Sequence, residues 1–162
     1  MCAYLKSMVW RSFYKSLYLH KLIVNMMYYW IIPGNLKIFR VTDYFLKNEI
    51  VDWKQSHYKF KVGDIVFLYI SSPISSIKYM LEVIKTDIPF EESIDDREYW
   101  TKNHALASGV KHYKYIRLKL LKASDSPLLH INSLEHFGAK VPQGATHNLS
   151  FELIDHILKQ FE

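Results

Sequence analysis

Glycine and cysteine are both scarce in this chain. Five glycines in 162 residues provide neither a glycine-rich loop that could cradle a phosphate nor a Gly-x-Ser-x-Gly nucleophile turn. The single cysteine, Cys2, cannot form an internal disulfide or a cysteine zinc site, which fits a reducing compartment. These absences exclude a disulfide-built scaffold and a nucleotide-dependent enzyme, and we expect a cytoplasmic protein without a cofactor.

Acidic residues are absent from the first 27 residues, which carry four basic ones. The rest of the chain has 17 basic and 16 acidic residues, so most of the formal charge of +5 comes from the N-terminal segment. The body of the chain is therefore almost neutral. Binding of nucleic acid there would depend on local basic patches rather than on a bulk positive field.

Long hydrophobic runs are missing as well. Polar residues interrupt the apolar N-terminal stretch, which falls short of the ~20 residues that span a bilayer and lacks the pattern of a signal peptide. A basic amphipathic helix at a membrane surface is one interpretation. The other, which we favour, is an extension upstream of a start at Met26 or Met27. We predict an N-terminal extension at residues 1–27, a single domain at residues 28–162 and no membrane partner.

Aromatic residues, in contrast, are abundant, with 12 Tyr, 9 Phe and 4 Trp. They suit a β-rich fold, and they also suit a surface on which bases stack. Since the helical and strand patterns do not alternate strictly, we predict an α+β fold, a small curved sheet or barrel flanked by short helices. Apolar alternation and turn residues predict strands at 28–33, 62–71, 77–88 and 112–123. Helices are predicted at 41–50, within 126–138 and at 149–162, and 52–60 is irregular or a short helix.

Local signals predict where the helices begin and end. We expect Thr42 or Asp43 to cap the first helix, Ser150 to cap the last one and Gly138 to end the middle one. Asn132 opens a capping-box pattern. The last helix is predicted to bury Phe151, Ile154, Ile157, Leu158 and Phe161. In the strands, Ile77, Tyr79, Leu81 and Val83 are predicted to share one face, and Arg117 and Lys119 to point outward from Ile116, Leu118 and Leu120.

No metal-binding or catalytic pattern stands out. None of the eight histidines has the i, i+4 spacing, with a glutamate, that a zinc protease requires. The acidic segment 91–98 lacks the glycine-containing register of a calcium loop, so we interpret it as a solvated loop. We predict no metal site, no catalytic residue and no enzymatic activity. A small hydrolase or nuclease acting on modified nucleotides is kept as an alternative.

The stretch from Asp52 to Ser71, DWKQSHYKFKVGDIVFLYIS, combines aromatic and hydrogen-bonding side chains around an apolar strand. An aromatic face can stack on a base, and an amide presents a donor and an acceptor together, which can match a base edge. Such a base must be out of its stack, so its polymer would be single-stranded or the base flipped. In the alternative interpretation, Trp53 plugs one end of a barrel and Tyr69 belongs to the core.

The order of short motifs resembles the EVE domain family, which is related to the PUA and ASCH folds. That pattern begins with a Tyr-Trp strand and continues with a Trp before a polar segment, a Gly-Asp turn, a strand ending in Tyr-x-Ser and a Glu-Val strand. The matching residues are Tyr29-Trp30, Trp53 with Gln55 and Ser56, Gly63-Asp64, Tyr69 with Ser71, and Leu81-Glu82-Val83, over roughly residues 28–158. Two segments depart from it: Lys54-Gln55-Ser56-His57 replaces the common Gly-Val-Arg-Asn, and Gln143-Gly144 lies where relatives carry Arg-Leu-Ser-x-Gln-Pro.

The resemblance implies a PUA-like curved β-barrel or mixed sheet that recognises a modified base in DNA or RNA, often beside a nuclease or another defence protein. A second interpretation stays open, a PUA-type module that binds tRNA or rRNA by shape and phosphates without reading a modification. The oligomeric state is left open. The implied base-binding residues are Trp30, Trp53, Gln55, Ser56, Tyr69 and Ser71, with a core role as the alternative for Trp30 and with Gln143 either approaching the pocket or lying in a loop. Lys54, Lys59, Lys61 and Lys78 lie near these elements and are predicted to contact phosphates.

Overall fold

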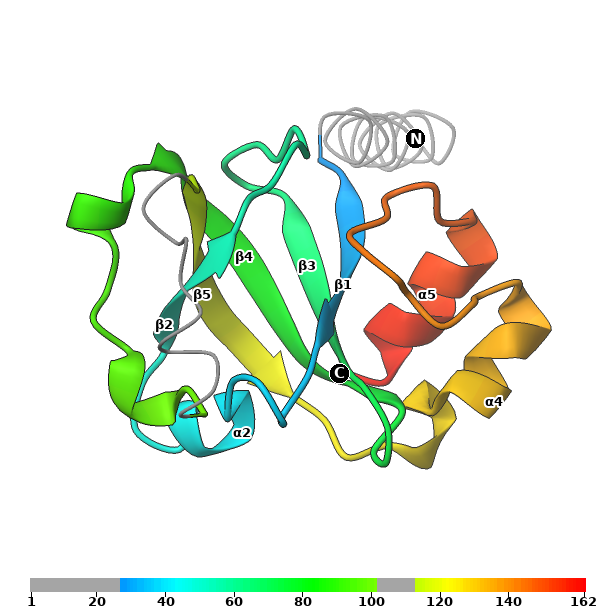
Figure 1. Ribbon diagram of the computed structural model, residues 1–162. Coiled ribbons are helices and arrows are strands. Elements are labelled where there is room, and N and C mark those ends of the chain that lie inside the picture. Colours follow the sequence, from blue (N-terminus) through cyan, green and yellow to red (C-terminus); the bar gives the residue numbers. More distant parts are fainter. Residues whose placement is uncertain (1–26, 102–112) are drawn as a thin grey trace, which may run out of the picture.

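The computed structural model describes residues 27–101 and 113–162. Its strands are β1 (Tyr29–Gly34), β2 (Ile50–Lys54), β3 (Ile65–Ile70), β4 (Ser76–Ile88) and β5 (Tyr115–Ala123). They form one mixed sheet in the order β1-β3-β4-β5-β2 (Figure 1). Strands β1 and β3 run parallel, and the other neighbouring strands are antiparallel. The two edges of the sheet are therefore β1 and β2.

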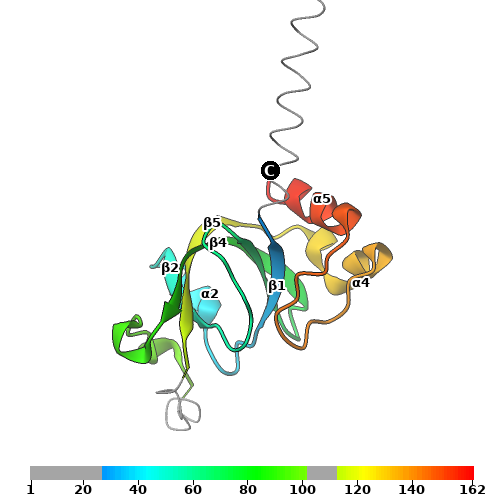
Figure 2. The same cartoon turned by 90° about the horizontal axis from the view of Figure 1, so that it is seen from above.

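Short helices flank this sheet, which confirms the predicted α+β class. The helices are α2 (Val41–Tyr44), α4 (Ile131–Leu134) and α5 (Phe151–Lys159), and 3-10 turns occupy Phe90–Glu92, Arg97–Tyr99, Pro127–Leu129 and Glu135–Phe137. Helices α4 and α5 lie together beside β1, on one side of the sheet (Figure 1). Viewed from above, the sheet curls into an open barrel with β1 and β2 on opposite sides (Figure 2).

Two hydrophobic cores lie on the two faces of the sheet. Val66, Leu68 and Ile70 of β3 belong to the core inside the barrel, whereas Phe67 and Tyr69 belong to the core under α4 and α5. Because both of its faces are covered, β3 has the continuous apolar sequence of a buried strand. The barrel core also contains Trp30, Ile32, Phe39, Val51, Phe60, Leu81, Ile116 and Leu118. The second core also contains Ile31, Leu129, Leu134, Leu153, Ile157 and Phe161.

The first predicted helix is wrong in its length and in its cap. Helix α2 ends at Tyr44, and it follows Arg40 without a side-chain hydrogen bond, so neither Thr42 nor Asp43 caps it. The chain then turns back, and Tyr44 Oη donates a hydrogen bond of 2.6 Å to the carbonyl oxygen of Ile50. Ile50 begins β2, a strand that was not predicted. Its conformation is set by pairing with β5, far away in the sequence, and not by a local apolar pattern.

The caps of the later helices follow the predictions only in part. Ser150 Oγ accepts a hydrogen bond of 3.2 Å from the amide of Leu153 at the start of α5, as predicted. Gly138 ends the preceding 3-10 turn with a φ of +82°, which is also as predicted. The capping box at Asn132 is wrong, because α4 begins after His130, whose Nδ1 accepts a hydrogen bond from the Asn132 amide.

The buried face of α5 is displaced from the predicted one. Leu153, Ile157 and Phe161 are buried in the second core, as the helical period requires. Phe151, which was predicted to be buried, is 73% exposed because it is the first residue of the helix and lies outside this core. The remaining predicted members, Ile154 and Leu158, are half-buried.

The face predicted for β4 is interrupted by a bulge. Tyr79, Leu81 and Val83 contact the barrel core, but Ile77 is buried in the second core. The register between β3 and β4 shifts at this point, so that one extra residue of β4 reverses the alternation of its side chains. The prediction that Ile77 shares a face with the other three residues is therefore wrong.

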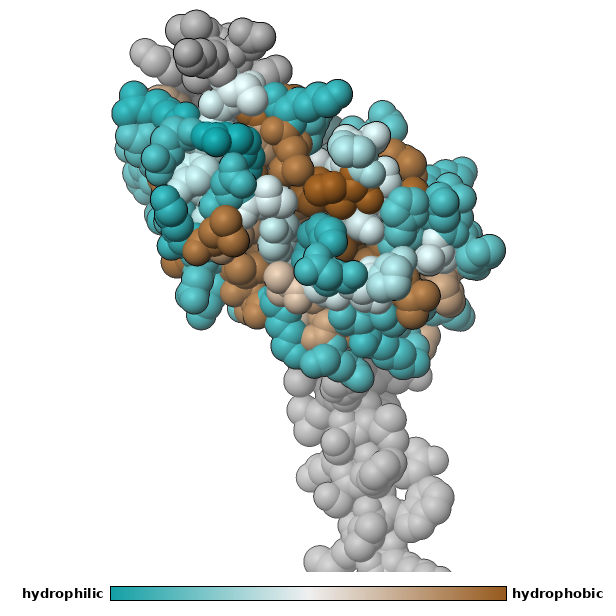
Figure 3. Space-filling view, turned by 90° about the horizontal axis from the view of Figure 1, so that it is seen from below, coloured by the Kyte–Doolittle hydropathy of each residue, from teal (hydrophilic) through white to brown (hydrophobic). Residues whose placement is uncertain are grey.

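No helix within residues 27–101 and 113–162 is long and apolar enough to cross a membrane. Viewed from below, the surface is mostly hydrophilic, with hydrophobic residues gathered near the centre of that face (Figure 3). The predicted N-terminal extension, apart from Met27, and the first residue of the strand predicted at 112–123 lie outside the described residues. The domain boundary at residue 28 therefore stays a prediction.

Candidate functional site

Trp53 belongs to β2, one edge of the sheet, and its ring reaches β1, the other edge. Its ring extends from β2 across to β1, since a methyl group on Gly34 would lie 3.5 Å from Trp53 Cη2. The ring also makes an edge contact with Phe39, with their centroids 6.0 Å apart. Trp53 packs against the barrel core but is only half-buried. It therefore closes the barrel between β1 and β2 and leaves part of its surface accessible.

Trp30 is buried and belongs to the barrel core, so the structure places it away from a ligand face. Its indole nitrogen donates a hydrogen bond of 2.8 Å to Asp64 Oδ2. Asp64 is 1% exposed and also accepts hydrogen bonds from the amides of Tyr28, at 3.0 Å, and Lys61, at 2.9 Å. The predicted Gly-Asp turn, with Gly63 at a φ of +91°, thus holds the start of β1 and the loop before β3 together.

Gln55 is buried, and its amide is already engaged by backbone groups. Its Oε1 accepts a hydrogen bond of 2.8 Å from the amide of Asp87, and its Nε2 donates one of 3.4 Å to the carbonyl of Tyr58. The next residue, Ser56, is exposed with a φ of +54°, a left-handed conformation that forms the turn after β2. These two residues shape the turn that presents His57 and Tyr58.

Tyr69 and Ser71 lie at different places relative to Trp53. Tyr69 is buried in the second core, on the opposite face of β3 from the barrel interior. Ser71 is half-buried, and its amide donates a hydrogen bond of 2.9 Å to the carbonyl of Gly34. Gly34 is thus approached by Trp53 from β2 and by Ser71 from the end of β3. Of the six residues predicted for the base pocket, the structure brings Trp53 and Ser71 together at Gly34. Trp30, Gln55 and Tyr69 are buried in other roles, and Ser56 is exposed in the turn after β2.

Three of the predicted phosphate-binding lysines gather at one end of the barrel. Lys54 Nζ lies 3.3 Å from the ring centroid of Tyr113, and Lys61 Nζ lies 5.1 Å from that of Tyr28. Lys59 is exposed in the loop 55–64. Both ribbon views show this loop passing between the start of β5 and the start of β1 (Figures 1 and 2). The residues here called the basic aromatic rim are Tyr28, Lys54, His57, Lys59, Lys61 and Tyr113.

The fourth lysine and Gln143 lie outside the basic aromatic rim. Lys78 Nζ is 2.6 Å from Asp125 Oδ1, near the start of β4, whereas the rim adjoins the end of that strand. Gln143 is an exposed loop residue. Its neighbour Gly144 packs closely against Tyr58, because a methyl group there would clash with Tyr58 Oη.

Tyr58 and His147 are site residues that the sequence motifs did not indicate. The His147 ring lies 4.4 Å from that of Trp30 and 5.3 Å from that of Tyr28. The rings of Tyr58 and His57 lie 4.2 Å apart. These contacts connect the basic aromatic rim to the barrel core. Tyr58 lies within the predicted stretch and could have been chosen for its aromatic ring, but no local signal connects His147 with it.

Replacing Gly144 with alanine is expected to lower the free energy of unfolding by about 1–2 kcal/mol, because the new methyl group must displace the Tyr58 hydroxyl. The new methyl group would lie 3.6 Å from Tyr58 Cζ, which is an ordinary contact distance. Removing the hydroxyl with Tyr58→Phe should therefore remove most of this loss in the double variant. Urea denaturation of the two single variants and the double variant measures the coupling. Strictly additive effects would show that Gly144 and Tyr58 do not contact each other.

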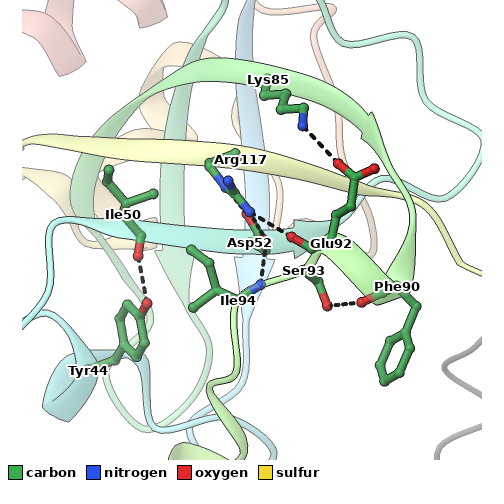
Figure 4. Close-up of polar contacts among 9 residues, drawn as sticks. All are labelled: Tyr44, Ile50, Asp52, Lys85, Phe90, Glu92, Ser93, Ile94 and Arg117. Carbon is green, nitrogen blue, oxygen red and sulfur yellow. Dashed lines mark hydrogen bonds and ion pairs between the residues drawn. The ribbon is translucent and has the colours of Figure 1, made fainter.

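An ion pair attaches the acidic connection 89–100 to the outside of the barrel. Arg117, predicted to point outward, folds against β2 and donates hydrogen bonds of 2.8 and 2.9 Å to Asp52 (Figure 4). The Asp52 carboxylate also accepts a hydrogen bond of 2.8 Å from the amide of Ile94, and Arg117 donates one to the carbonyl of Glu92. Each carboxylate oxygen of Asp52 therefore accepts a hydrogen bond from within the protein.

Burial changes the pKa values of two groups near this connection. Burial, followed by the charge of Asp96, raises the pKa of Tyr44 to about 12. Burial also raises the pKa of Asp96, although a hydrogen bond of 2.8 Å from the Trp100 indole nitrogen opposes the rise. The bridge between Phe39 and Trp100 then connects this segment to the barrel core.

A cavity of about 510 Å³ is lined by Asp95, Arg97 and Glu98. Two of these charges are already paired, since Arg97 donates hydrogen bonds of 2.6 and 2.7 Å to Asp95 and lowers the pKa of that carboxyl to about 2. Among the described residues, those that line this cavity are all charged, so none of them gives a base an aromatic wall. Over the described parts of the chain, no group of three or more His, Cys, Asp or Glu side chains is arranged to hold a metal ion.

Comparison with known proteins bears on the fold alone. The sequence matches no protein-family model and no curated protein. Among solved structures, it is similar to ASCH from Zymomonas mobilis, with a TM-score of 0.58 and 12% identity over 83% of this chain and 96% of that one. It is also similar to the DUF55 domain of human thymocyte nuclear protein 1, with a TM-score of 0.55 and 11% identity over 83% of this chain and 98% of that one. A hypothetical protein from Leishmania major is similar with a TM-score of 0.55 and 15% identity over 82% of this chain and 93% of that one.

The chain has the PUA-like fold of ASCH and DUF55 domains. This confirms the predicted relationship to the PUA and ASCH folds and the curved mixed sheet. Identities of 11–15% establish the architecture and no residue roles. Membership of the EVE family within this PUA-like fold, and the roles predicted for individual residues, therefore stay predictions.

Proposed function

We propose that this PUA-like chain is a cytoplasmic binding module that recognises a modified base in DNA or RNA. The supporting observation is the position of Trp53, whose half-buried aromatic ring lies between β1 and β2. The barrel that it closes also carries the basic aromatic rim. Stacking of one base on an aromatic side chain is worth about 1–3 kcal/mol. The module therefore supplies recognition, and a nuclease or another defence protein supplies any cleavage.

In this proposal Trp53 stacks on the base. Tyr58 contacts the base from the loop 55–64, and Ser71 contacts it from the end of β3. Gln55 and Ser56 act through the turn that positions Tyr58. Trp30 and Tyr69 support this arrangement from the two cores. Phosphate contacts come from Lys54, Lys59 and Lys61 of the basic aromatic rim, whereas Lys78 is paired with Asp125.

A titration at low salt tests the proposal. Labelled short DNA and RNA strands, either unmodified or carrying methylated cytosine, hydroxymethylated cytosine or methylated adenine, are followed by fluorescence polarisation. Tighter binding of one modified strand is the expected result. Equal binding of all RNA strands would instead favour the RNA-binding module that does not read a modification. Turnover of modified nucleotides with added divalent metals would favour the hydrolase.

Replacing Trp53 with alanine should abolish the preference for the modified strand, because the stacking surface is lost. The ratio of dissociation constants for unmodified and modified strands should fall to about one. Since Trp53 is only half-buried, the free energy of unfolding should fall by about 2 kcal/mol, less than for a fully buried tryptophan. Trp53→Phe keeps an aromatic face and should retain part of the preference. A folded Trp53→Ala variant with an unchanged ratio would exclude Trp53 from the base site.

A further inference from the structure

Two exposed tyrosines delimit the basic aromatic rim. Tyr28 precedes β1 and is 44% exposed, and Tyr113 precedes β5 and is 42% exposed. Each has a lysine ammonium over its ring, Lys61 at 5.1 Å and Lys54 at 3.3 Å. Lys54 ends β2, and Lys61 lies in the loop 55–64 that follows it. The turn that carries His57 and Tyr58 is therefore flanked in the chain by two lysines that each contact one of the tyrosines.

The charges around this loop favour a negatively charged partner. Residues 53–63 contain three lysines and no acidic residue. Asp64, which follows, is buried and engaged with three donors. Asp87, the acidic residue whose amide contacts Gln55, is paired with Lys114 at 3.1 Å. The described acidic neighbours of the loop therefore leave its positive charge available to phosphates.

A base would replace the lysine above each tyrosine ring. A lysine over an exposed aromatic ring gains less free energy than a base stacked on that ring. Lys54 and Lys61 have long flexible side chains, so both can leave the rings and contact the adjacent phosphates. In the free protein the lysines cover the ring faces, and in the complex each tyrosine–lysine pair would hold one nucleotide.

We infer that the basic aromatic rim binds the nucleotides on both sides of the recognised base, and that the ligand is a single strand rather than a duplex with one flipped base. This inference rests on the proposed function. In a duplex the neighbouring bases remain paired and stacked within the helix, so their faces are closed to Tyr28 and Tyr113. Protein contacts beside a flipped base then go mainly to the phosphates, and exposed aromatic platforms gain nothing.

The test compares Tyr28→Ala, Tyr113→Ala and the double variant with the wild type. The probes are a labelled nine-nucleotide strand with the preferred modified base at its centre, the same strand unmodified, and a duplex that contains the modified base. Each single variant should bind the modified strand at least about five-fold more weakly, and the losses should multiply in the double variant. The ratio between modified and unmodified strands should stay unchanged, because Trp53 is intact. Wild-type protein should bind the duplex more weakly than the strand.

Matched variants separate stacking from other effects. Tyr28→Phe and Tyr113→Phe keep the ring and should bind like the wild type. Phe151→Ala removes an aromatic side chain that is 73% exposed on α5 and should leave binding unchanged. Undiminished binding by the double alanine variant, or tighter binding of the duplex than of the strand by wild-type protein, would overturn the inference and leave the proposed function standing. A wild-type protein that binds none of the probes would overturn both.

Discussion

Asp64→Ala is expected to lower the free energy of unfolding by about 4 kcal/mol, because it leaves three donors without their acceptor. The carboxylate of Asp64 accepts hydrogen bonds from the amides of Tyr28 and Lys61 and from the indole nitrogen of Trp30. It is 1% exposed, so water cannot readily replace it. A buried donor without a partner costs about 1–3 kcal/mol, and three such donors exceed the effect of most single substitutions. Urea denaturation measures the change.

Two further variants separate this effect from a general loss of charge. Asp64→Asn keeps one acceptor oxygen but turns an amide donor toward the others, so we expect about half of the loss. Asp155→Ala removes an exposed carboxylate whose ion pair with Lys159 spans one helical turn, and we expect a loss of about 0.5 kcal/mol or less. A loss below about 1 kcal/mol for Asp64→Ala would mean that the three donors find other acceptors.

The second large effect is expected at Asp52. Its side chain is 2% exposed and binds both Arg117 and the amide of Ile94. Removing one partner of a buried ion pair leaves the other charge uncompensated and typically costs about 3–5 kcal/mol. Arg117 is 25% exposed and can recover some hydration, so we expect about 3 kcal/mol for Asp52→Ala.

Asp125→Ala is the matched control for Asp52→Ala. Asp125 also forms an ion pair, with Lys78 at 2.6 Å, but its side chain is 97% exposed. We expect less than about 1 kcal/mol for this variant. Similar losses in the two variants would show that burial does not set the strength of the Asp52 pair. The connection 89–100 should also become more accessible to protease in Asp52→Ala, since its attachment at Ile94 is lost.

The elements with a strong local pattern were predictable from the sequence. The alternation in β4 and β5, the unbroken apolar run of β3 and the Ser150 cap of α5 each depend on residues close together in the chain. Strand β2 was not predictable in this way, because its five residues include two charged ones and its partner β5 lies more than 60 residues away. The bulge in β4 is equally invisible, since it follows from the register against β3.

The candidate site shows the same division. The half-buried position of Trp53 fits a tryptophan before a polar segment, whereas its role in binding a base stays a prediction. Gln55 was assigned to a base edge because nothing local shows that its amide binds Asp87, which lies 32 residues away. Tyr69 was left between a pocket role and a core role because β3 is covered on both faces, and the structure places it in the second core. His147 reaches the site only through the return of the C-terminal segment to β1.

The free edge of β1 has a consequence for how the chain behaves at high concentration. Ile31 uses its amide and its carbonyl on Thr146, at 2.8 and 3.0 Å, and Pro33, the next residue that points outward, has no amide hydrogen. An edge strand normally offers a row of unpaired groups that another molecule can extend into an aggregate. Here that row is interrupted at two successive positions, so many copies can gather at high concentration without polymerising through β1.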